Sequence, residues 1–371
     1  MKVLIFGKPG SIWVKTVVEH TLIKYGDEVA ILSTLEDENN PFLDFYKKNN
    51  VKIFPYKKHK GKLGTLISGF TNKDVIKDHY DLFCVHYLNN SAYCVIPVAK
   101  HYCKRVLLFC WGSDLLREGK RSFMSSNAFR LADHIGISTN DMLVKFHSLH
   151  GHSYDHKIVR TCYGVNGLDI IRDIKTNNKS IRSKYNIDPE KVVITIGYSN
   201  SPEQQHLKVL DQIMSLSDED KSRIHLILRV TYGSGTDEYI TQVKNLAEKT
   251  GCSYSVFESF LTDMEIAELT SVTDIFIHAQ TTDARSASMQ EFLFANCLVI
   301  NPKWISYSDF EDRVFYLKFE NFEELKTLVS DNLVLKGNSR YIDKLMKNSE
   351  VVADLSLWEH LEPVWRKAYT E

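Results

Sequence analysis

Two acidic residues stand eight positions apart where a polar segment becomes apolar. Residues 280–300 read QTTDARSASMQEFLFANCLVI, with Asp283 in the polar half and Glu291 among Met, Phe and Leu. A carboxylate one turn inside a helix can accept two ribose hydroxyl groups, while the free N–H groups at the helix start hold phosphate. The plainer alternative is that Glu291 only favours the helix dipole and Asp283 is a turn residue.

The chemistry of these acids depends on where the helix begins. The apolar pattern predicts a strand over residues 274–277, a loop from Gln280, and a helix that starts near Ser286, Ala287 and Ser288. The N–H groups of that first turn would then face the carboxyl end of the strand. We therefore predict that Gln280 and the start of the helix bind a nucleotide.

A second group of polar residues follows the expected strand 192–196. Tyr198, Ser199 and Asn200 come directly after Gly197 and before a helix expected at Pro202. Helix N-termini bind anions, and Lys208, or His206 if it is charged, could add a positive charge for a diphosphate. An ordinary helix cap with a solvated Lys208 explains the same residues.

Arg229 leaves the next expected strand, 224–228, and is followed by Thr231 and Tyr232. An Arg at the end of a buried strand is either a phosphate clamp or part of an ion pair with a helix. We predict that Arg229, Thr231 and Tyr232 belong to the nucleotide site.

The elements that must hold these residues alternate between short apolar runs and amphipathic helices, which predicts parallel strands covered by helices. The polar segment 164–180 separates two series of such elements. The expected strands are 3–6, 28–32, 81–85, 105–109, 134–137 and 157–160, then 192–196, 224–228, 252–256, 274–277 and 297–300. We therefore predict an α/β fold of two doubly wound, Rossmann-like domains that face each other across a cleft.

Composition limits the partners of this chain. It has 371 residues, with 46 Lys and Arg against 47 Asp and Glu, so its net charge gives no reason to expect nucleic-acid binding. No apolar run approaches the roughly 18 residues that span a bilayer. Seven scattered cysteines suit reduced thiols, so a cytoplasmic protein is expected.

One local patch is strongly basic. Four lysines and a histidine precede an apolar segment between residues 56 and 70; the lysines are Lys57, Lys58, Lys60 and Lys62. Such a mixture suits peripheral contact with anionic lipid at the inner face of the membrane, and a solvated loop before a core helix explains it equally well.

The sequence favours a site without metal or other cofactor. No pair of aspartates occurs as Asp-x-Asp in a suitable loop after a strand. The histidines His147, His150, His152 and His156 lie close in sequence, but we expect them in a loop without acidic or cysteine partners.

The order of these features resembles the GT-B glycosyltransferases. Their family four carries a Glu, seven residues and a second Glu where this chain has Asp283 and Glu291. Further similar segments are KPGSIW (8–13) with Gly10, DLFCVH (81–86) with His86, WGSD (111–114) with Trp111 and Asp114, ADHIGIS (132–138) and YGVN (163–166).

The resemblance implies roles and limits for the domains. It implies that His86 and Asp283 act at the reaction centre, that Gly10 lies on the donor side, and that Trp111 and Asp114 lie on the acceptor side. It also implies an N-terminal acceptor domain over 1–170, a nucleotide-sugar domain over 171–350, and a C-terminal helix over 351–371 that crosses back to the first domain.

GYSNSPEQQH (197–206) and TYGSGTDEYITQV (231–243) are also similar to the bacterial transferases of 4-acetamido-4,6-dideoxygalactose. Family four retains anomeric configuration and this second family inverts it, so the course of the reaction stays open.

Together the resemblances imply transfer from a UDP- or dTDP-sugar to a saccharide or lipid-linked saccharide in bacterial surface polysaccharide synthesis, such as lipopolysaccharide or capsule. Two alternatives are an inactive nucleotide-sugar-binding partner of another transferase, and a nucleotide-sugar epimerase of the same fold.

Overall fold

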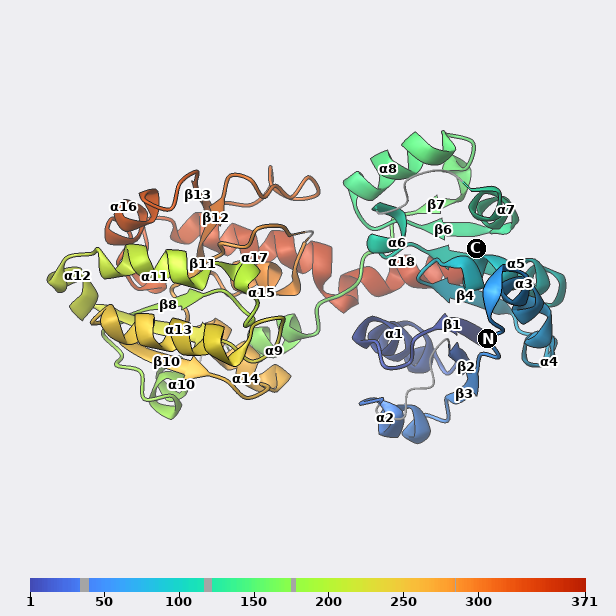
Figure 1. Cartoon of the computed structure of the whole chain (residues 1–371), viewed down its shortest axis with the longest axis horizontal. Coiled ribbons are helices and arrows are strands. Elements are labelled where there is room, and N and C mark those ends of the chain that lie inside the picture. The colour runs from blue at the N-terminus through green and yellow to red at the C-terminus, as the bar shows by residue number, and fades with distance from the viewer. Residues whose placement is uncertain (34–39, 117–121, 175–177, 284) are drawn as a thin grey trace. The chain divides into compact units, whose positions relative to one another are not determined.

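The protein is described by a computed structural model that covers residues 1–33, 40–116, 122–174, 178–283 and 285–371, without the side chains of Lys62, Ser113 and Leu116. The chain forms two compact units (Figure 1). Unit 1 is Met1–Gly164 with Trp358–Glu371, and unit 2 is Val165–Leu357. The C-terminal helix thus belongs with the first unit, as the predicted fold has it, but from Trp358 and not from residue 351.

Unit 1 is built on one parallel sheet in the order β3-β2-β1-β4-β5-β6-β7. Its strands are β1 (Lys2–Gly7), β2 (Glu28–Ser33), β3 (Lys52–Pro55), β4 (Leu82–His86), β5 (Arg105–Phe109), β6 (His134–Gly136) and β7 (Ile158–Val159).

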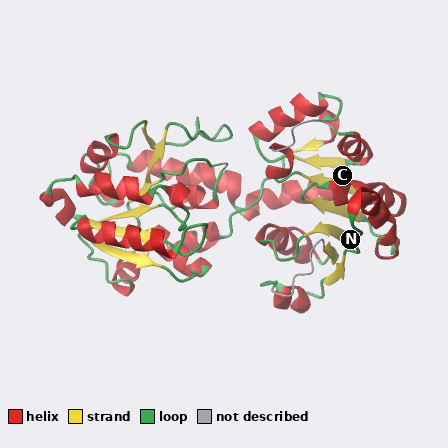
Figure 2. Cartoon of the chain, viewed as in Figure 1, coloured by secondary structure: helices red, strands yellow, loops and turns green. Residues whose placement is uncertain are grey.

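Helices cover both faces of this sheet (Figure 2). Leu4 and Phe6 of β1 pack in one apolar core with residues of α5 (Asn90–Tyr102) and α7 (Phe123–Leu131). Val3 and Ile5 pack in another with residues of α1 (Ile12–Val17) and α18 (Trp358–Thr370). The helices are α1 (Ile12–Val17), η1 (Val18–Leu22), η2 (Ile23–Tyr25), α2 (Leu43–Lys48), α3 (Gly61–Thr71), α4 (Lys73–Ile76), α5 (Asn90–Tyr102), α6 (Ser113–Leu116), α7 (Phe123–Leu131), α8 (Asn140–His150), η3 (Asp155–Lys157) and α18 (Trp358–Thr370).

Unit 2 repeats the plan with a parallel sheet in the order β10-β9-β8-β11-β12-β13. Its strands are β8 (Val192–Ile196), β9 (Ile224–Arg229), β10 (Ser253–Phe257), β11 (Ile275–Ile277), β12 (Leu298–Pro302) and β13 (Leu317–Phe319).

The helices of unit 2 are α9 (Gly167–Ile174), α10 (Asn178–Lys184), η4 (Pro202–Gln204), α11 (His206–Met214), α12 (Asp218–Ser222), α13 (Asp237–Lys249), α14 (Asp263–Val272), α15 (Ala287–Phe294), α16 (Glu324–Ser330), η5 (Lys336–Asn338) and α17 (Ile342–Ser356). Segment 164–180 was expected to be a polar crossing, and this was wrong for α9. Leu168 and Ile171 lie on the inner face of that helix and are fully buried.

The eleven strands expected from the sequence are present, some shifted by a few residues, and two more are found. The additional strands, β3 and β13, each form one edge of a sheet. Both are short and partly exposed, so they lack the continuous apolar run that marks a central strand.

The strand orders locate where a ligand can bind in each unit. The order reverses between β1 and β4 in unit 1 and between β8 and β11 in unit 2. Ligands of open parallel sheets bind outside the carboxyl ends of the strands at such reversals. The residues after β8, β9 and β11 are therefore the candidates in unit 2. Within the described ranges, no helix is long and apolar enough to cross a membrane.

Candidate functional site

The loops after β8 and β11 meet through Tyr198 and Gln280. The Tyr198 hydroxyl donates a hydrogen bond to Gln280 Oε1, which also accepts from Gln204 Nε2 at 3.2 Å. The Tyr198 ring lies parallel to that of His278, with centroids 6.2 Å apart. Gln280 therefore joins the two loops at the reversal of the sheet, and its amide oxygen is already occupied.

Arg229 ends β9 and is only 3% exposed. Its Nε and Nη2 are buried without a hydrogen-bond acceptor among the described residues. The guanidinium carbon lies 5.2 Å from the ring centroid of Phe292, and burial lowers the pKa of the guanidinium. A buried cation with unused N–H donors is costly unless an anion completes it.

Glu291 is the matching buried acid on α15, at 8% exposure. Burial raises its pKa, and the positive charge of Arg229 acts in the opposite direction. Gly167, the first residue of α9, gives this carboxylate room, because a Cβ at that position would lie 2.6 Å from Glu291 Oε1. Gly167 is absent from the residues predicted from the sequence, since only the packing of α9 against α15 reveals its role.

Asp283 is held by the predicted cap residue Ser286 and by Tyr307 and His278, which the sequence did not indicate. Its Oδ2 accepts from the Tyr307 hydroxyl at 2.5 Å and from the Ser286 N–H at 3.3 Å. His278 Nε2 lies 3.8 Å from the same oxygen, and His278 Nδ1 lies 2.8 Å from Asn301 Oδ1. These contacts fix the loop before α15, so Asp283 has the surroundings of a positioning residue.

The predicted start of the helix at residues 286–288 is confirmed. Ser286 is the N-cap of α15, and its Oγ accepts a hydrogen bond from Met289 N–H at 3.2 Å. Ala287 and Ser288 form the first turn and are half-buried. The chain enters the helix through Arg285, whose left-handed φ of 81° turns the backbone.

The polar residues after β8 and β9 mostly bind each other. Asn200 N–H donates to the Tyr232 carbonyl at 2.7 Å, and Asn200 Oδ1 accepts from Gly235 N–H at 3.1 Å. Ser199 is 4% exposed, Thr231 is half-buried, and Tyr232 is 50% exposed. Ser199 and Asn200 therefore shape the loops, whereas the Tyr232 side chain is open to a ligand.

Lys208 lines a hollow that adjoins the loop after β11, since Thr281 and Trp304 line it too and Trp304 Nε1 donates to the Gln280 carbonyl at 3.0 Å. Lys208 Nζ donates to Gln205 Oε1 at 2.8 Å and lies 5.0 Å from the Phe322 ring centroid, in this hollow, which Glu320 also lines. The other cation considered, His206, is fully buried, and burial lowers its pKa to about 4. His206 is therefore neutral near pH 7 and cannot supply the charge.

In unit 1, His86 ends β4 beside the reversal of the sheet and is 2% exposed. Its Nδ1 lies 3.2 Å from the Tyr163 hydroxyl, and its ring stacks on Phe109 and Trp365 with centroids 5.0 and 6.1 Å away. Burial lowers the pKa of His86 to about 3. The ring is thus neutral and a weak proton acceptor, while its Nε2 has no hydrogen-bond partner among the described residues.

The residues expected on the acceptor side serve local structure in unit 1. Asp114 accepts hydrogen bonds from Trp111 N–H and Leu88 N–H, each at 2.9 Å. Trp111 packs edge-on against His86, with ring centroids 6.2 Å apart. Gly10 lies half-buried in the loop after β1. Asp114 therefore ties the loop after β4 to the loop after β5.

The histidine cluster differs from its expected setting. His147 lies in helix α8, and Asp155 bridges it to His152, with N···O distances of 2.9 and 3.0 Å. The expectation that the cluster has no acidic partner was wrong. Ligand atoms of these three residues lie within 4.8 Å of one another and could hold a metal. His150 instead packs in the core against Phe129.

No family model and no curated protein matches this chain. Several solved structures match this chain in fold. A glycosyltransferase from Rickettsia africae is 14% identical, with a TM-score of 0.71 and coverage of 100% of this chain and 99% of that one. Anabaena HepE in complex with UDP-glucose is 13% identical, with a TM-score of 0.63 and coverage of 99% and 98%.

The UDP-GlcNAc 2-epimerase of Neisseria meningitidis is 13% identical, with a TM-score of 0.58 and coverage of 99% and 98%. The shared feature is the architecture of two parallel α/β sheets. The chain accordingly has the GT-B fold that the sequence resemblance implied.

Proposed function

We propose that this protein is a glycosyltransferase that takes a sugar from a nucleotide-diphosphate donor, either a UDP-sugar or a dTDP-sugar. The observation that carries the proposal is the pair Arg229 and Glu291, both buried beside the sheet reversal of unit 2, with unused N–H donors on Arg229. Similarity in fold to glycosyltransferases supports it.

The two charges suit the two ends of a nucleoside diphosphate. The guanidinium of Arg229 can donate to the diphosphate and stabilise the negative charge that grows on it as the sugar departs. The carboxylate of Glu291 can accept hydrogen bonds from ribose hydroxyls. Tyr232 offers an exposed ring beside the same loops.

The rest of the proposal concerns the acceptor and the reaction. We propose a saccharide or lipid-linked saccharide acceptor in bacterial surface polysaccharide synthesis, at the cytoplasmic face of the membrane. The proposed reaction needs no metal, because a cation and the N–H groups of α15 can offset the diphosphate charge. His86 and Asp283 remain the proposed residues of the reaction centre, Asp283 as a positioning residue.

A second candidate, a nucleotide-sugar epimerase, is favoured by the similar fold of the N. meningitidis enzyme. An inactive nucleotide-sugar-binding protein would also use Arg229 and Glu291. Product analysis separates these three functions.

The test is a screen of UDP- and dTDP-sugars for released nucleoside diphosphate, with and without a bacterial membrane extract, in EDTA. A transferase releases nucleoside diphosphate when acceptor is present, and Arg229→Met removes that release. Conversion of the donor sugar alone indicates an epimerase, and binding without turnover indicates an inactive binder. Activity that EDTA abolishes and Mg²⁺ restores would contradict the metal-independent reaction.

A further inference from the structure

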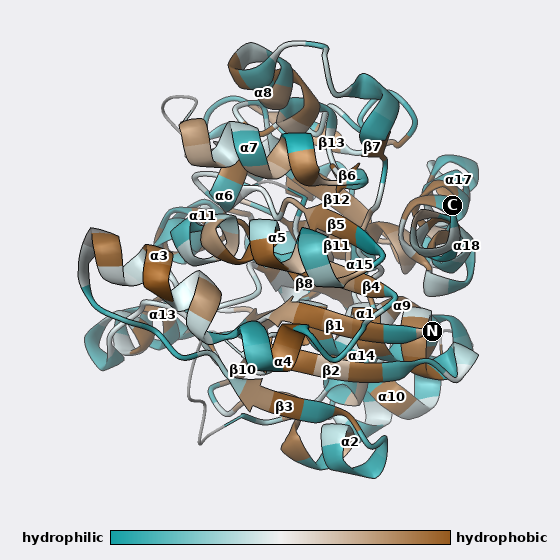
Figure 3. Ribbon diagram, turned by 90° about the vertical axis from the view of Figure 1, so that its right-hand side faces the viewer, coloured by the Kyte–Doolittle hydropathy of each residue, from teal (hydrophilic) through white to brown (hydrophobic). Residues whose placement is uncertain are grey.

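Helix α3 exposes its large apolar side chains and buries its small residues. The residues on its inner face are Gly64, Ser68 and Gly69. Its outer face carries Leu63, Leu66, Ile67 and Phe70, which are 72%, 50%, 44% and 71% exposed. A surface helix in water normally has the opposite arrangement. Figure 3 shows the hydrophobic segments along α3.

Close backbone contacts hold α3 in this orientation. A Cβ on Gly69 would lie 2.4 Å from the carbonyl oxygen of Cys94 in α5, and one on Gly64 would lie 2.9 Å from the backbone of His59. Ser68 Oγ accepts from His59 N–H and donates to the Gly64 carbonyl, each at 2.8 Å. Larger residues do not fit on the inner face, so Leu66 and Phe70 cannot turn inward.

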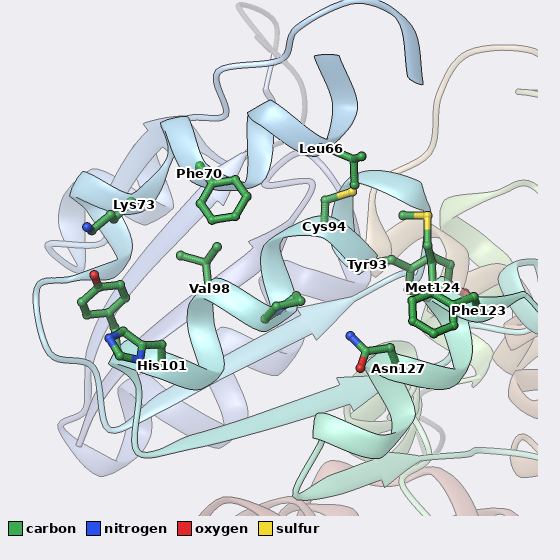
Figure 4. A pocket seen from close by; sticks show the side chains of 12 residues that line it. Leu66, Phe70, Lys73, Tyr93, Cys94, Val98, His101, Phe123, Met124 and Asn127 are labelled. Atoms are coloured by element: carbon green, nitrogen blue, oxygen red, sulfur yellow. The ribbon is translucent and has the colours of Figure 1, made fainter. Parts of the chain in front are cut away.

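The exposed face of α3 continues into an apolar groove (Figure 4). Leu66 and Phe70 line it from α3, Pro97 and Val98 from α5, and Phe123 from α7. Phe123 is 87% exposed. A patch of this kind on one unit indicates an interaction surface rather than scattered exposed residues.

The charge beside this patch is mostly positive, and Asp74 is the one acid that lines the hollows next to it among the described residues. Residues 56–73 contain lysines and no Asp or Glu. Lys57, Lys58, Lys60 and Lys73 are exposed, and all four line hollows next to the groove. The first acid after them, Asp74, pairs with Lys77 at 2.7 Å.

We infer that α3 and the tip of α7 dock on an anionic lipid bilayer. Leu63, Leu66, Phe70 and Phe123 would enter the boundary between headgroups and acyl chains, and the lysines would contact lipid phosphates. A second copy of the chain fits less well, because a two-fold contact would set lysines against lysines. The inference rests on the proposed function, since a lipid-linked acceptor gives a transferase a reason to dock.

The test is co-sedimentation of the full chain with vesicles. Vesicles of phosphatidylglycerol and phosphatidylcholine should bind the protein, and vesicles of phosphatidylcholine alone should bind it much less. Leu66→Ser with Phe70→Ser should weaken binding at least about tenfold, and Lys58→Gln with Lys60→Gln at least about tenfold at low salt. Matched controls in unit 2 are Phe260→Ser, which changes an 81% exposed ring, and Lys326→Gln with Lys347→Gln.

Equal binding to both vesicle types, equal binding by the α3 variants and their controls, or no vesicle binding would overturn the inference. So would a concentration-dependent dimer in ultracentrifugation that the Leu66 and Phe70 changes abolish. Vesicle binding requires no sugar donor. Binding as expected from a protein that turns over no nucleotide sugar would therefore refute the proposed function and leave the docking surface in place.

Discussion

Burial acts in opposite directions on Arg229 and Glu291, lowering the pKa of the guanidinium and raising that of the carboxylate. Each charge favours the charged form of the other, because opposite charges attract more strongly away from water. Neither forms an ion pair within 4.0 Å in the part of the chain that is described. The two charges are therefore not neutralised by direct contact, and both stay available for the proposed nucleotide.

At this residue scale, Glu291→Ala should weaken nucleoside diphosphate binding about 30-fold, because two hydrogen bonds to ribose are lost. Glu291→Gln should retain part of the affinity, since one acceptor oxygen remains. Isothermal titration calorimetry measures both. Glu248→Ala, an exposed change on α13, is the control. An unchanged affinity in folded Glu291→Ala protein would show that the ribose lies elsewhere.

His86 can be tested with a substitution that keeps its aromatic surroundings. His86→Phe retains a flat ring against Phe109 and Trp365 but removes a partner of the buried Tyr163 hydroxyl, so the melting temperature should fall by a few degrees. If His86 Nε2 contacts the sugar, kcat should fall about 100-fold while nucleotide affinity stays nearly the same. Retained turnover in His86→Phe, or equal loss in stability and activity, would assign His86 to the core.

At the scale of elements, the contact of α9 with α15 sets the position of the Glu291 carboxylate. Gly167 begins α9 and leaves space for Glu291 Oε1. The carboxylate is the end of a flexible side chain, so a methyl group at Gly167 can move it without disturbing either helix. A substitution at Gly167 can therefore change the affinity for nucleotide while leaving the stability of the fold nearly unchanged.

Gly167→Ala should lower nucleotide affinity about tenfold, while the melting temperature changes by only a few degrees. The matched control is Gly337→Ala, since a Cβ on Gly337 meets nothing within 4 Å. Isothermal titration calorimetry measures the nucleotide affinity of both variants, and thermal unfolding measures their melting temperatures. Loss of stability in Gly167→Ala without loss of affinity would mean that this contact serves packing alone.

At the scale of the whole molecule, buried neutral histidines make stability depend on pH. Burial lowers the pKa of His86 to about 3 and the pKa values of His206 and His225 to about 4. In the unfolded chain these histidines bind protons near pH 6.5. The contribution of the neutral, buried histidines to the free energy of unfolding is therefore fully present above pH 6.5 and is lost as the pH falls toward 4. Lowering the pKa of one histidine from 6.5 to about 4 corresponds to about 3 kcal/mol in the free energy of unfolding.

The melting temperature should accordingly fall steeply between pH 6.5 and about 4.5. His206→Gln removes one of these groups, so the transition of unit 2 should depend less on pH. His101→Gln, at an exposed position of unit 1, should leave the slope unchanged. Differential scanning calorimetry across this range is the measurement, and equal slopes for the original chain and His206→Gln would contradict the assignment.

The sequence by itself determined the two series of parallel strands and the start of α15. Buried central strands are continuous apolar runs, and the polar residues before α15 form a local cap, so both follow from neighbours along the chain. The same locality explains why the sequence alone points to Arg229, at the end of an apolar run, and to Glu291, one turn inside a helix.

Only the tertiary structure decided what each polar group contacts. Tyr307 and Asp283, 24 positions apart, are joined by a hydrogen bond, and Gly167 meets a carboxylate from α15. The inverted face of α3 depends in the same way on its approach to Cys94. Such contacts arise from the packing of elements that are distant in sequence. Periodicity along the chain cannot predict them, because it indicates only which face of an element is apolar.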